Sequence, residues 1–220
     1  MKTGQTAPAA HELHFDARLG GRDFRFATTW GLFHPKGIDA GTALLLQQLE
    51  VEPEATCLDL GCGWGPIGLT LAHLAPAGHV HMVDKDFVAI EYAQKNADVN
   101  GCANTSIYLS NGFSHVPADV HFDLVVSNIP AKVGGELLQF WMTQTHRRLH
   151  PGGALWVVTV AGLKDYVTRV FRETFGNHRT VKQRGTHVVA MALRQSVGGL
   201  LFFAQHALHF RQQPRHLVEQ

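Results

Sequence analysis

A glycine-rich turn gives the strongest chemical signal in this chain of 220 residues. It follows the apolar run Leu58-Asp59-Leu60 and reads Gly61-Cys62-Gly63-Trp64-Gly65-Pro66-Ile67-Gly68. Glycines let a backbone turn approach a ligand closely, and the helix that such a turn opens attracts polar groups to its N-terminus. The spacing of Gly63, Gly65 and Gly68 also matches the dinucleotide fingerprint, a short pattern with many false matches. The turn therefore predicts a nucleotide-containing ligand without choosing its class.

Two carboxylates near the turn narrow the choice of ligand. Asp59 ends the preceding strand, where it would repel a pyrophosphate but attract the ammonium and sulfonium groups of S-adenosylmethionine. Asp84, in Val83-Asp84-Lys85-Asp86, stands 23 residues after Gly61, about the distance at which a ribose-binding carboxylate is expected. Asp84 thus supports an adenosine ligand in general, and Asp59 favours S-adenosylmethionine over a dinucleotide.

The elements that must position these residues alternate between strand and helix patterns. Alternating polar and apolar residues around Gly20-Gly21 predict a β-hairpin over 12–28. Strands are expected at 56–60, 79–83, 106–109, 122–126, 154–160, 180–183 and 187–193, and helices at 39–49, 66–74, 87–99, 135–149 and 163–175. This order predicts an α/β, Rossmann-like, doubly wound sheet of seven strands, mostly parallel with an antiparallel last strand. Such sheets bind ligands at the carboxyl ends of their strands, where the turn and both carboxylates fall.

Composition and charge set further bounds. A content of 45% hydrophobic and 17% charged residues is typical of a globular domain, and excludes collagenous, disordered and coiled-coil chains. We expect one domain over 1–195 and a C-terminal extension over 196–220. The net charge of +1 hides an uneven distribution, because 1–131 hold 7 basic and 14 acidic residues, whereas 132–220 hold 12 basic and 4 acidic ones. The basic half could contact phosphates, or could be an ordinary solvated surface.

Other signals concern the compartment. Cys57, Cys62 and Cys102 form no C-x-x-C pair, which suits a reducing compartment, so we expect a cytoplasmic protein without a zinc site. Residues 1–14 lack a secretory pattern, and the most apolar run, 154–163, is far shorter than the roughly 20 residues of a membrane helix. We therefore expect neither a metal nor a membrane partner.

The residues of the turn resemble a known family, the class I S-adenosylmethionine-dependent methyltransferases, whose first motif is very similar to residues 58–65. Residues 26–42 (FATTWGLFHPKGIDAGT) resemble the segment before the first sheet strand of the "small domain" methyltransferases, which include the 16S ribosomal RNA guanine-N2 enzymes. Asn111-Gly112-Phe113 is similar to the turn that contacts adenine in such enzymes. The resemblance covers roughly residues 12–194 and implies a methyltransferase that uses S-adenosylmethionine.

The resemblance also implies roles for single residues. Asp59 and the backbone of Gly61, Cys62, Gly63 and Gly65 would hold the methionine moiety, Asp84 the ribose hydroxyls, and Lys85, Asn111, Gly112 and Phe113 the adenine surroundings. Asp39 and Thr42 would flank the methionine end. Some of these residues have simpler interpretations. Asp39 could equally be the N-cap of the following helix, Cys62 a small residue tolerated in the turn, and Trp64 a packing residue or a cover over the turn.

The acceptor side of the site is predicted at Asn128-Ile129-Pro130-Ala131, where the family usually has Asn-Pro-Pro and an aromatic residue. The Asn side-chain oxygen and the next carbonyl can accept both hydrogens of a planar amino or amide nitrogen, which aligns its lone pair with the methyl group. Ile129 keeps that carbonyl, although Pro would hold the turn more rigidly. Asn128, Ile129 and Pro130 are therefore the predicted catalytic residues.

Ala131 leaves the substrate open, because it lacks the ring that would stack on a base. Phe33 or Trp141 could supply that ring instead. The favoured hypothesis is an N-methyltransferase for a guanine exocyclic amine of ribosomal RNA, with a part in RNA methylation and rRNA processing. The alternatives are a protein glutamine amide or a small molecule as substrate, and an S-adenosylmethionine-binding protein that has lost catalysis.

Overall fold

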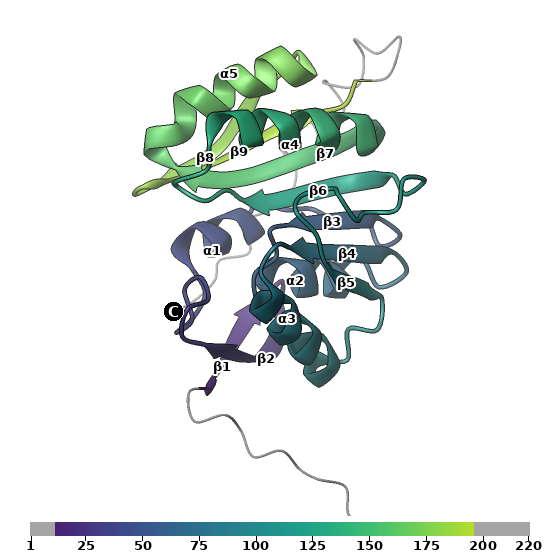
Figure 1. Cartoon of the computed structure of the whole chain (residues 1–220), viewed down its shortest axis with the longest axis vertical. Coiled ribbons are helices and arrows are strands. Elements are labelled where there is room, and N and C mark those ends of the chain that lie inside the picture. Colours follow the sequence, from purple (N-terminus) through teal and green to yellow (C-terminus); the bar gives the residue numbers. More distant parts are fainter. Residues whose placement is uncertain (1–11, 196–220) are drawn as a thin grey trace, which may run out of the picture.

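Residues 12–195, which the computed structural model describes, form a β-hairpin and a seven-stranded sheet with helices on both faces (Figure 1). The predicted extension over 196–220 lies outside these residues. In chain order the elements are β1 (Glu12–Leu19), β2 (Arg22–Thr29), α1 (Ala40–Leu46), β3 (Thr56–Leu60), α2 (Pro66–Leu74), β4 (His79–Asp84), α3 (Phe87–Asn100), β5 (Thr105–Leu109), β6 (Phe122–Asn128), α4 (Gly135–Arg148), β7 (Leu149–Val160), the 3-10 turn η1 (Ala161–Leu163), α5 (Lys164–Phe175), β8 (Arg179–Arg184) and β9 (His187–Leu193). No helix among these residues is long and apolar enough to cross a membrane.

The sheet order confirms the predicted doubly wound fold. The strands lie in the order β5-β4-β3-β6-β7-β9-β8, with parallel pairing from β5 through β7. The last strand, β9, inserts between β7 and β8 and pairs antiparallel with both. The chain moves outward from β3 in one direction and then returns to place β6 on the other side. The carboxyl ends of β3 and β6 therefore meet at the switch point where such sheets bind ligands.

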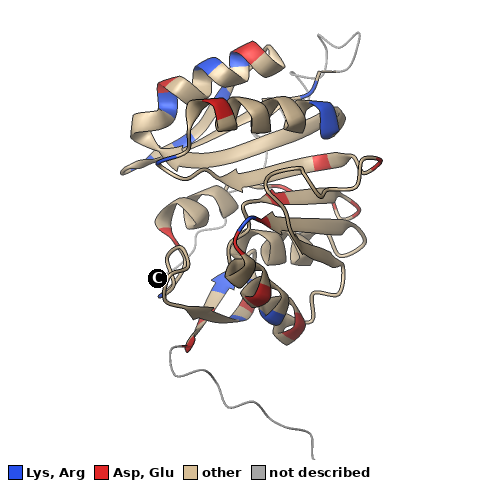
Figure 2. Cartoon of the chain, viewed as in Figure 1, with Lys and Arg blue, Asp and Glu red and all other residues tan. Residues whose placement is uncertain are grey.

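Charge is divided across the sheet. Figure 2 shows Lys and Arg on α5, β8 and the end of α4, on the side of the sheet beyond β6. Residues 132–195 hold ten basic and three acidic side chains. The basic ones are Lys132, Arg147, Arg148, Lys164, Arg169, Arg172, Arg179, Lys182, Arg184 and Arg194. The two carboxylates of the predicted cofactor site, Asp59 and Asp84, lie on the other side, at β3 and β4.

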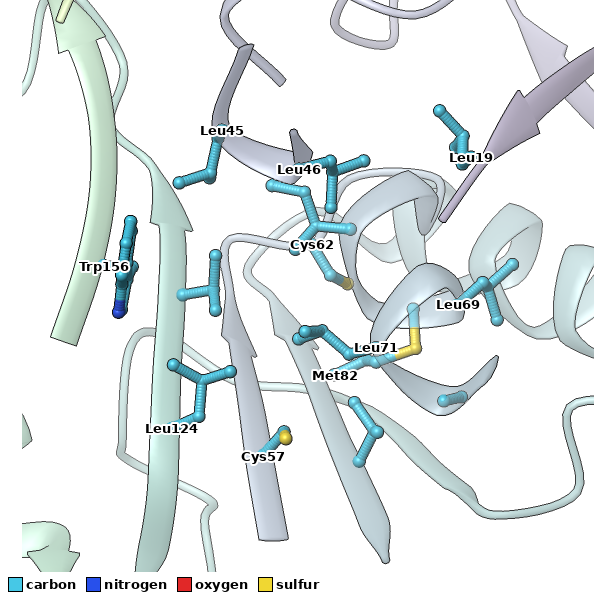
Figure 3. Packing of buried hydrophobic residues seen from close by; sticks show 14 of the residues in the cluster. Leu19, Leu45, Leu46, Cys57, Cys62, Leu69, Leu71, Met82, Leu124 and Trp156 are labelled. Atoms are coloured by element: carbon cyan, nitrogen blue, oxygen red, sulfur yellow. The ribbon is translucent and has the colours of Figure 1, made fainter. Parts of the chain in front are cut away.

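Alternation along the strands builds a core on each face of the sheet. Cys57, Leu124 and Trp156 point to the face that carries the hairpin, α1, α2 and α3 (Figure 3). Their chain neighbours Leu58 and Val125 point to the opposite face, which α4 and α5 cover. Both faces are apolar because strands of a doubly wound sheet are buried on both sides.

The hairpin is joined to the sheet domain by two buried asparagines on α3. The Asn96 side chain accepts from the Ala27 N–H at 2.7 Å and donates to the Ala27 and Trp64 carbonyls at 2.9 and 2.8 Å. Asn100 makes the same pair of bonds to Arg25, at 2.9 and 2.8 Å. The two amides thereby pair with the backbone N–H and carbonyl groups of Arg25 and Ala27 in β2. Asn96 also connects that strand to the glycine-rich turn.

Two element boundaries differ by three or more residues from those the sequence predicts. Helix α1 ends at Leu46 rather than at residue 49, because the Gln48 N–H bonds to the Leu45 carbonyl and tightens the last turn. Strand β7 begins at Leu149 rather than at 154, although Pro151 and two glycines stand there. Gly152 donates to the Arg194 carbonyl at 2.7 Å, so pairing with the segment after β9 extends β7 across these residues.

Candidate functional site

The glycine-rich turn is held by the neighbouring strand. The N–H groups of Gly61 and Cys62 both donate to the Val83 carbonyl at 2.9 Å. Gly61, Gly63 and Gly65 have φ angles of +79°, +55° and +102°, a region that favours glycine. A Cβ placed on Gly61 or Gly63 would meet no atom within 4 Å, so this side of the turn borders open space.

Asp59 lies beneath the turn and has no exposed surface. Its Oδ2 accepts from the Gly68 N–H at 2.7 Å, and its Oδ1 is buried without a partner among residues 12–195. Burial raises the pKa of Asp59 from 3.8 to about 7, against the Gly68 hydrogen bond, and the Asp84 charge adds to the rise. Because the side chain is fully covered, any effect of Asp59 on a ligand would come from its charge rather than from surface contact.

Asp84 is fixed at the end of β4 with its carboxylate half-buried. Its Oδ2 accepts from the Gly63 N–H at 2.9 Å, and its Oδ1 accepts from the Asp86 N–H at 3.0 Å. Each oxygen keeps a second lone pair, which a hydroxyl group could use. Lys85, between the two acids, is exposed. The structure therefore brings Asp84 to the turn, as the sequence predicts.

A second cluster lies at the end of β6. The Asn128 side-chain nitrogen donates to Asp39 Oδ2 at 2.9 Å and to Thr42 Oγ1 at 3.0 Å. Asp39 is also the N-cap of α1, because the same Oδ2 accepts from the Thr42 N–H at 3.0 Å. The N-cap interpretation of Asp39 is thus confirmed, and the same carboxylate also contacts Asn128. Its place at the methionine end of the cofactor stays a prediction.

His187 completes this cluster and was not singled out in the sequence. Its Nε2 lies 4.0 Å from Asp39 Oδ1. A Cβ on Gly41 would lie 2.7 Å from the His187 ring, so only glycine lets α1 approach β9 this closely. The single hint in the sequence is the glycine between Asp39 and Thr42, because a helix interior disfavours glycine unless another group lies close.

Ile129 and Pro130 follow Asn128 on the acceptor side. The Ile129 N–H donates to the Val158 carbonyl of β7 at 2.9 Å, and its side chain is buried. A proline has no N–H for this bond, so the strand contact provides the rigidity that a proline ring would give. Pro130 and Ala131 are exposed.

The turn after β5 packs against α4. Gly112 has a φ of +60°, and its carbonyl accepts from Ser110 Oγ at 2.7 Å. The indole of Trp141 lies so close that a Cβ on Gly112 would be 2.6 Å from Nε1. Phe113 is buried and Asn111 is exposed. Trp141 is therefore a neighbour of the predicted adenine turn.

Trp64 packs inside the fold. It is 3% exposed, contacts the Phe26 ring at a centroid distance of 5.0 Å, and donates from Nε1 to the Phe33 carbonyl at 2.9 Å. The bond fixes the backbone at Phe33, whose ring is 65% exposed.

Burial and nearby carboxylates raise the pKa of the Cys62 thiol well above its usual value, which argues against a nucleophilic role.

These residues fit S-adenosylmethionine. Asp59 Oδ1 is a buried acceptor without a described partner, so a cationic ligand beside the turn would compensate its charge. Open space next to Gly61 and Gly63 lets the ligand reach the backbone. Residues 12–195 hold no group of three or more His, Cys, Asp or Glu side chains that could bind a metal ion.

Several known proteins are similar to this chain in sequence. The family described as "Methyltransferase small domain" matches residues 23–191. The uncharacterized protein YbxB of Bacillus subtilis is 37% identical over 142 residues, which are 64% of this chain and 71% of that protein. Ribosomal RNA small subunit methyltransferase C of Klebsiella pneumoniae is 34% identical over 159 residues, which are 70% of this chain and 45% of that protein. The chain therefore spans about half the length of the curated methyltransferases that it matches.

Solved structures show the same fold. A 16S rRNA N2 methyltransferase of T. thermophilus, in complex with AdoMet and guanosine, matches with a TM-score of 0.76 and 26% identity. The match covers 88% of this chain and 53% of that chain. A ribosomal protein L11 methylase of Lactobacillus delbrueckii subsp. bulgaricus has a TM-score of 0.63 and 21% identity, over 75% of this chain and 82% of that one. The second likeness supports the fold alone.

Proposed function

Because this chain belongs to the methyltransferase small domain family, whose cofactor is S-adenosylmethionine, we propose that it methylates an exocyclic amino nitrogen of guanine in ribosomal RNA. The observation that carries the proposal is the fixed amide of Asn128. Both acceptors around its nitrogen belong to the protein, so its oxygen is the atom left for a substrate N–H. A site that offers only acceptors suits a nitrogen that carries hydrogens.

The proposed residues divide into two groups. The backbone of Gly61 and Gly63 and the carboxylate of Asp84 would hold the methionine and ribose parts of the cofactor, and Asn111 would lie beside the adenine. Asn128 Oδ1 and the Ile129 carbonyl would accept the two amino hydrogens and align the nitrogen lone pair. Bound S-adenosylmethionine supplies a sulfonium methyl group, so a C–N bond forms as the C–S bond breaks and the sulfur keeps the electron pair. The surplus proton leaves the methylated nitrogen to water, and alignment together with the two hydrogen bonds can supply much of the rate enhancement.

Two observations support RNA as the substrate. Relatives 31–34% identical are named as ribosomal RNA methyltransferases. The ends of β6, β7 and β8 point to the same edge of the sheet, so Lys132, Lys182 and Arg184 lie on the acceptor side and are exposed. Not every basic residue is available, because Arg148 and Arg194 donate to backbone carbonyls. Exposed cations beside the acceptor edge would bind phosphates, and a ribosomal RNA substrate would place the protein in the cytoplasm.

The experiment uses tritiated S-adenosylmethionine with the full-length protein and total RNA or total protein from a strain that lacks the gene. We expect label in ribosomal RNA, recovered as N2-methylguanosine after nuclease digestion, and at least a 100-fold lower rate with Asn128→Ala. Lys132→Ala provides a contrast, since it should weaken RNA binding while leaving cofactor binding unchanged. Label found only in protein would indicate that the substrate is a protein amide rather than RNA. Binding of the cofactor without label in either fraction would overturn the proposal that the protein is catalytic.

A further inference from the structure

We propose that Asp39 and Thr42 are positioning residues that set the orientation of the Asn128 amide, so that its oxygen rather than its nitrogen faces the acceptor. The proposal rests on the proposed function, because it concerns the same amino-group acceptor. It differs from the role that the resemblance implies, in which both residues flank the methionine end of the cofactor. What separates the two roles is the hydrogen bonding around the Asn128 side chain.

The chemistry of the two partners decides which way the amide points. A carboxylate can only accept hydrogen bonds, and Asp39 Oδ2 lies 2.9 Å from the Asn128 nitrogen. Thr42 Oγ1 accepts the second amide hydrogen at 3.0 Å. If the amide turned over, its oxygen would face the Asp39 carboxylate, and two acceptors would then stand against each other. Asp39 therefore selects one of the two amide orientations.

Asp39 is itself held in place by the tertiary structure. Its Oδ2 also accepts from the Thr42 N–H at 3.0 Å, so the start of α1 fixes the carboxylate. The tight approach of Gly41 to His187 anchors that start against β9. Thr42 is 3% exposed, so water competes little for its hydroxyl group. The amide is thus preorganised before a substrate arrives, which is the condition for an effective hydrogen-bond acceptor.

The orientation has a consequence for specificity. Asn128 Oδ1 and the Ile129 carbonyl are both acceptors, so the site favours an amino or amide nitrogen with two hydrogens. A ring nitrogen without hydrogen would direct its own lone pair at these oxygens and be rejected. Asp39 and Thr42 would therefore exclude such acceptors without touching the substrate.

A charge swap tests the proposal. Asn128→Asp places a second carboxylate against Asp39, so we expect its kcat to fall about 100-fold or more. Asp39→Asn alone leaves two amides that can pair in either orientation, with a loss of about 10-fold. In the double variant the amide introduced at position 39 can donate to the carboxylate introduced at position 128, while the oxygen of that amide still accepts from the Thr42 N–H. We expect the double variant to exceed Asn128→Asp at least 10-fold in kcat.

Two further readouts separate positioning from other roles. In the ligand-free protein, the melting temperature should fall by about 5 °C in Asn128→Asp and recover in the double variant. Calorimetry should give nearly the same Kd for S-adenosylmethionine in Asp39→Asn and wild type.

Variants of Thr42 test the second partner of the amide. Thr42→Val should lower kcat several-fold, whereas Thr42→Ser, which keeps the hydroxyl, should have a kcat close to that of the wild type.

The outcomes are distinguishable. Absence of any coupling in melting temperature overturns the pairing itself, and coupling without recovery of kcat overturns the positioning role. If the Kd for S-adenosylmethionine rises in Asp39→Asn as much as kcat falls, Asp39 binds the cofactor rather than positioning Asn128. Wild-type protein that labels neither RNA nor protein overturns the proposed function instead, whatever the melting temperatures show.

Discussion

Replacing Asp59 by asparagine should stabilise the ligand-free protein and weaken the cofactor site. The carboxyl is fully buried, and burial raises its pKa from 3.8 to about 7. Well below pH 3.8 it is protonated in the folded and the unfolded chain alike, so it contributes no pH dependence there. As pH rises toward 7 the unfolded chain ionises first, and the folded chain loses stability. Above about pH 7 both states are ionised and the loss is constant.

The two pKa values set the size of the effect. Each tenfold change in the ionisation constant corresponds to roughly 1.4 kcal/mol, so the full loss is about 4 kcal/mol. About 2 to 3 kcal/mol of it should develop between pH 5 and 8. Asparagine keeps an oxygen for the Gly68 N–H but carries no charge, so the variant escapes this loss. It also loses the attraction for a cationic ligand, and the Kd of S-adenosylmethionine should rise at least tenfold.

Urea denaturation between pH 5 and 8.5 measures the first effect, and calorimetry measures the second. The free energy of unfolding of Asp59→Asn minus that of wild type should grow by about 2 to 3 kcal/mol across this range. Asp98→Asn makes the same exchange on the exposed side of α3 and is the control. A difference that stays constant with pH would refute the raised pKa, and an unchanged Kd would refute the electrostatic role.

Three other perturbations test the packing around the site. Gly68→Ala places a Cβ 2.5 Å from the buried Met82 side chain, so urea denaturation should show a loss of about 1 to 3 kcal/mol; an unchanged midpoint would contradict this packing. Asn96→Leu removes both bonds to Ala27 and should cost about 2 to 4 kcal/mol, checked by thermal melting, whereas a loss below about 0.5 kcal/mol would mean that β2 finds other partners. Burial raises the pKa of Cys57 to about 12, so its thiol should react with Ellman's reagent only as fast as the protein unfolds, and immediate reaction would contradict its burial.

Local patterns gave most of the elements correctly. Thr56–Leu60, Pro66–Leu74 and His187–Leu193 have the predicted bounds, because alternation and helical periodicity reflect which side of each element is buried. The predicted start of β7 was wrong because it was based only on the local residue types. Pro151 and Gly152 indicate a loop, but the partner segment at Arg194 extends the strand across them. Pairing between distant segments overrides local propensity here.

The same distinction applies to the candidate site. Local sequence indicates some of its residues, whereas the contacts of others depend on the tertiary structure. The residue types and spacing of the turn, Asp59 and Asp84 point to the cofactor, because each lies at or directly after the end of a strand whose position the sequence reveals. The link between Asn128 and Asp39 crosses 89 residues, and nothing in either segment indicates the other. His187 was not found at all, since its contact with Gly41 depends on how α1 settles on β9.

The sequence by itself therefore determined the kind of sheet, and it predicted the cofactor turn and the asparagine of the acceptor side. These depend on periodicity and on short motifs, which act over a few residues. Only the tertiary structure decided that Asp59 is sealed beneath the turn with a raised pKa, and that Asp39 and Thr42 orient Asn128. Burial and the direction of an amide depend on segments far apart in the chain, and they are fixed only when the sheet and its helices pack together.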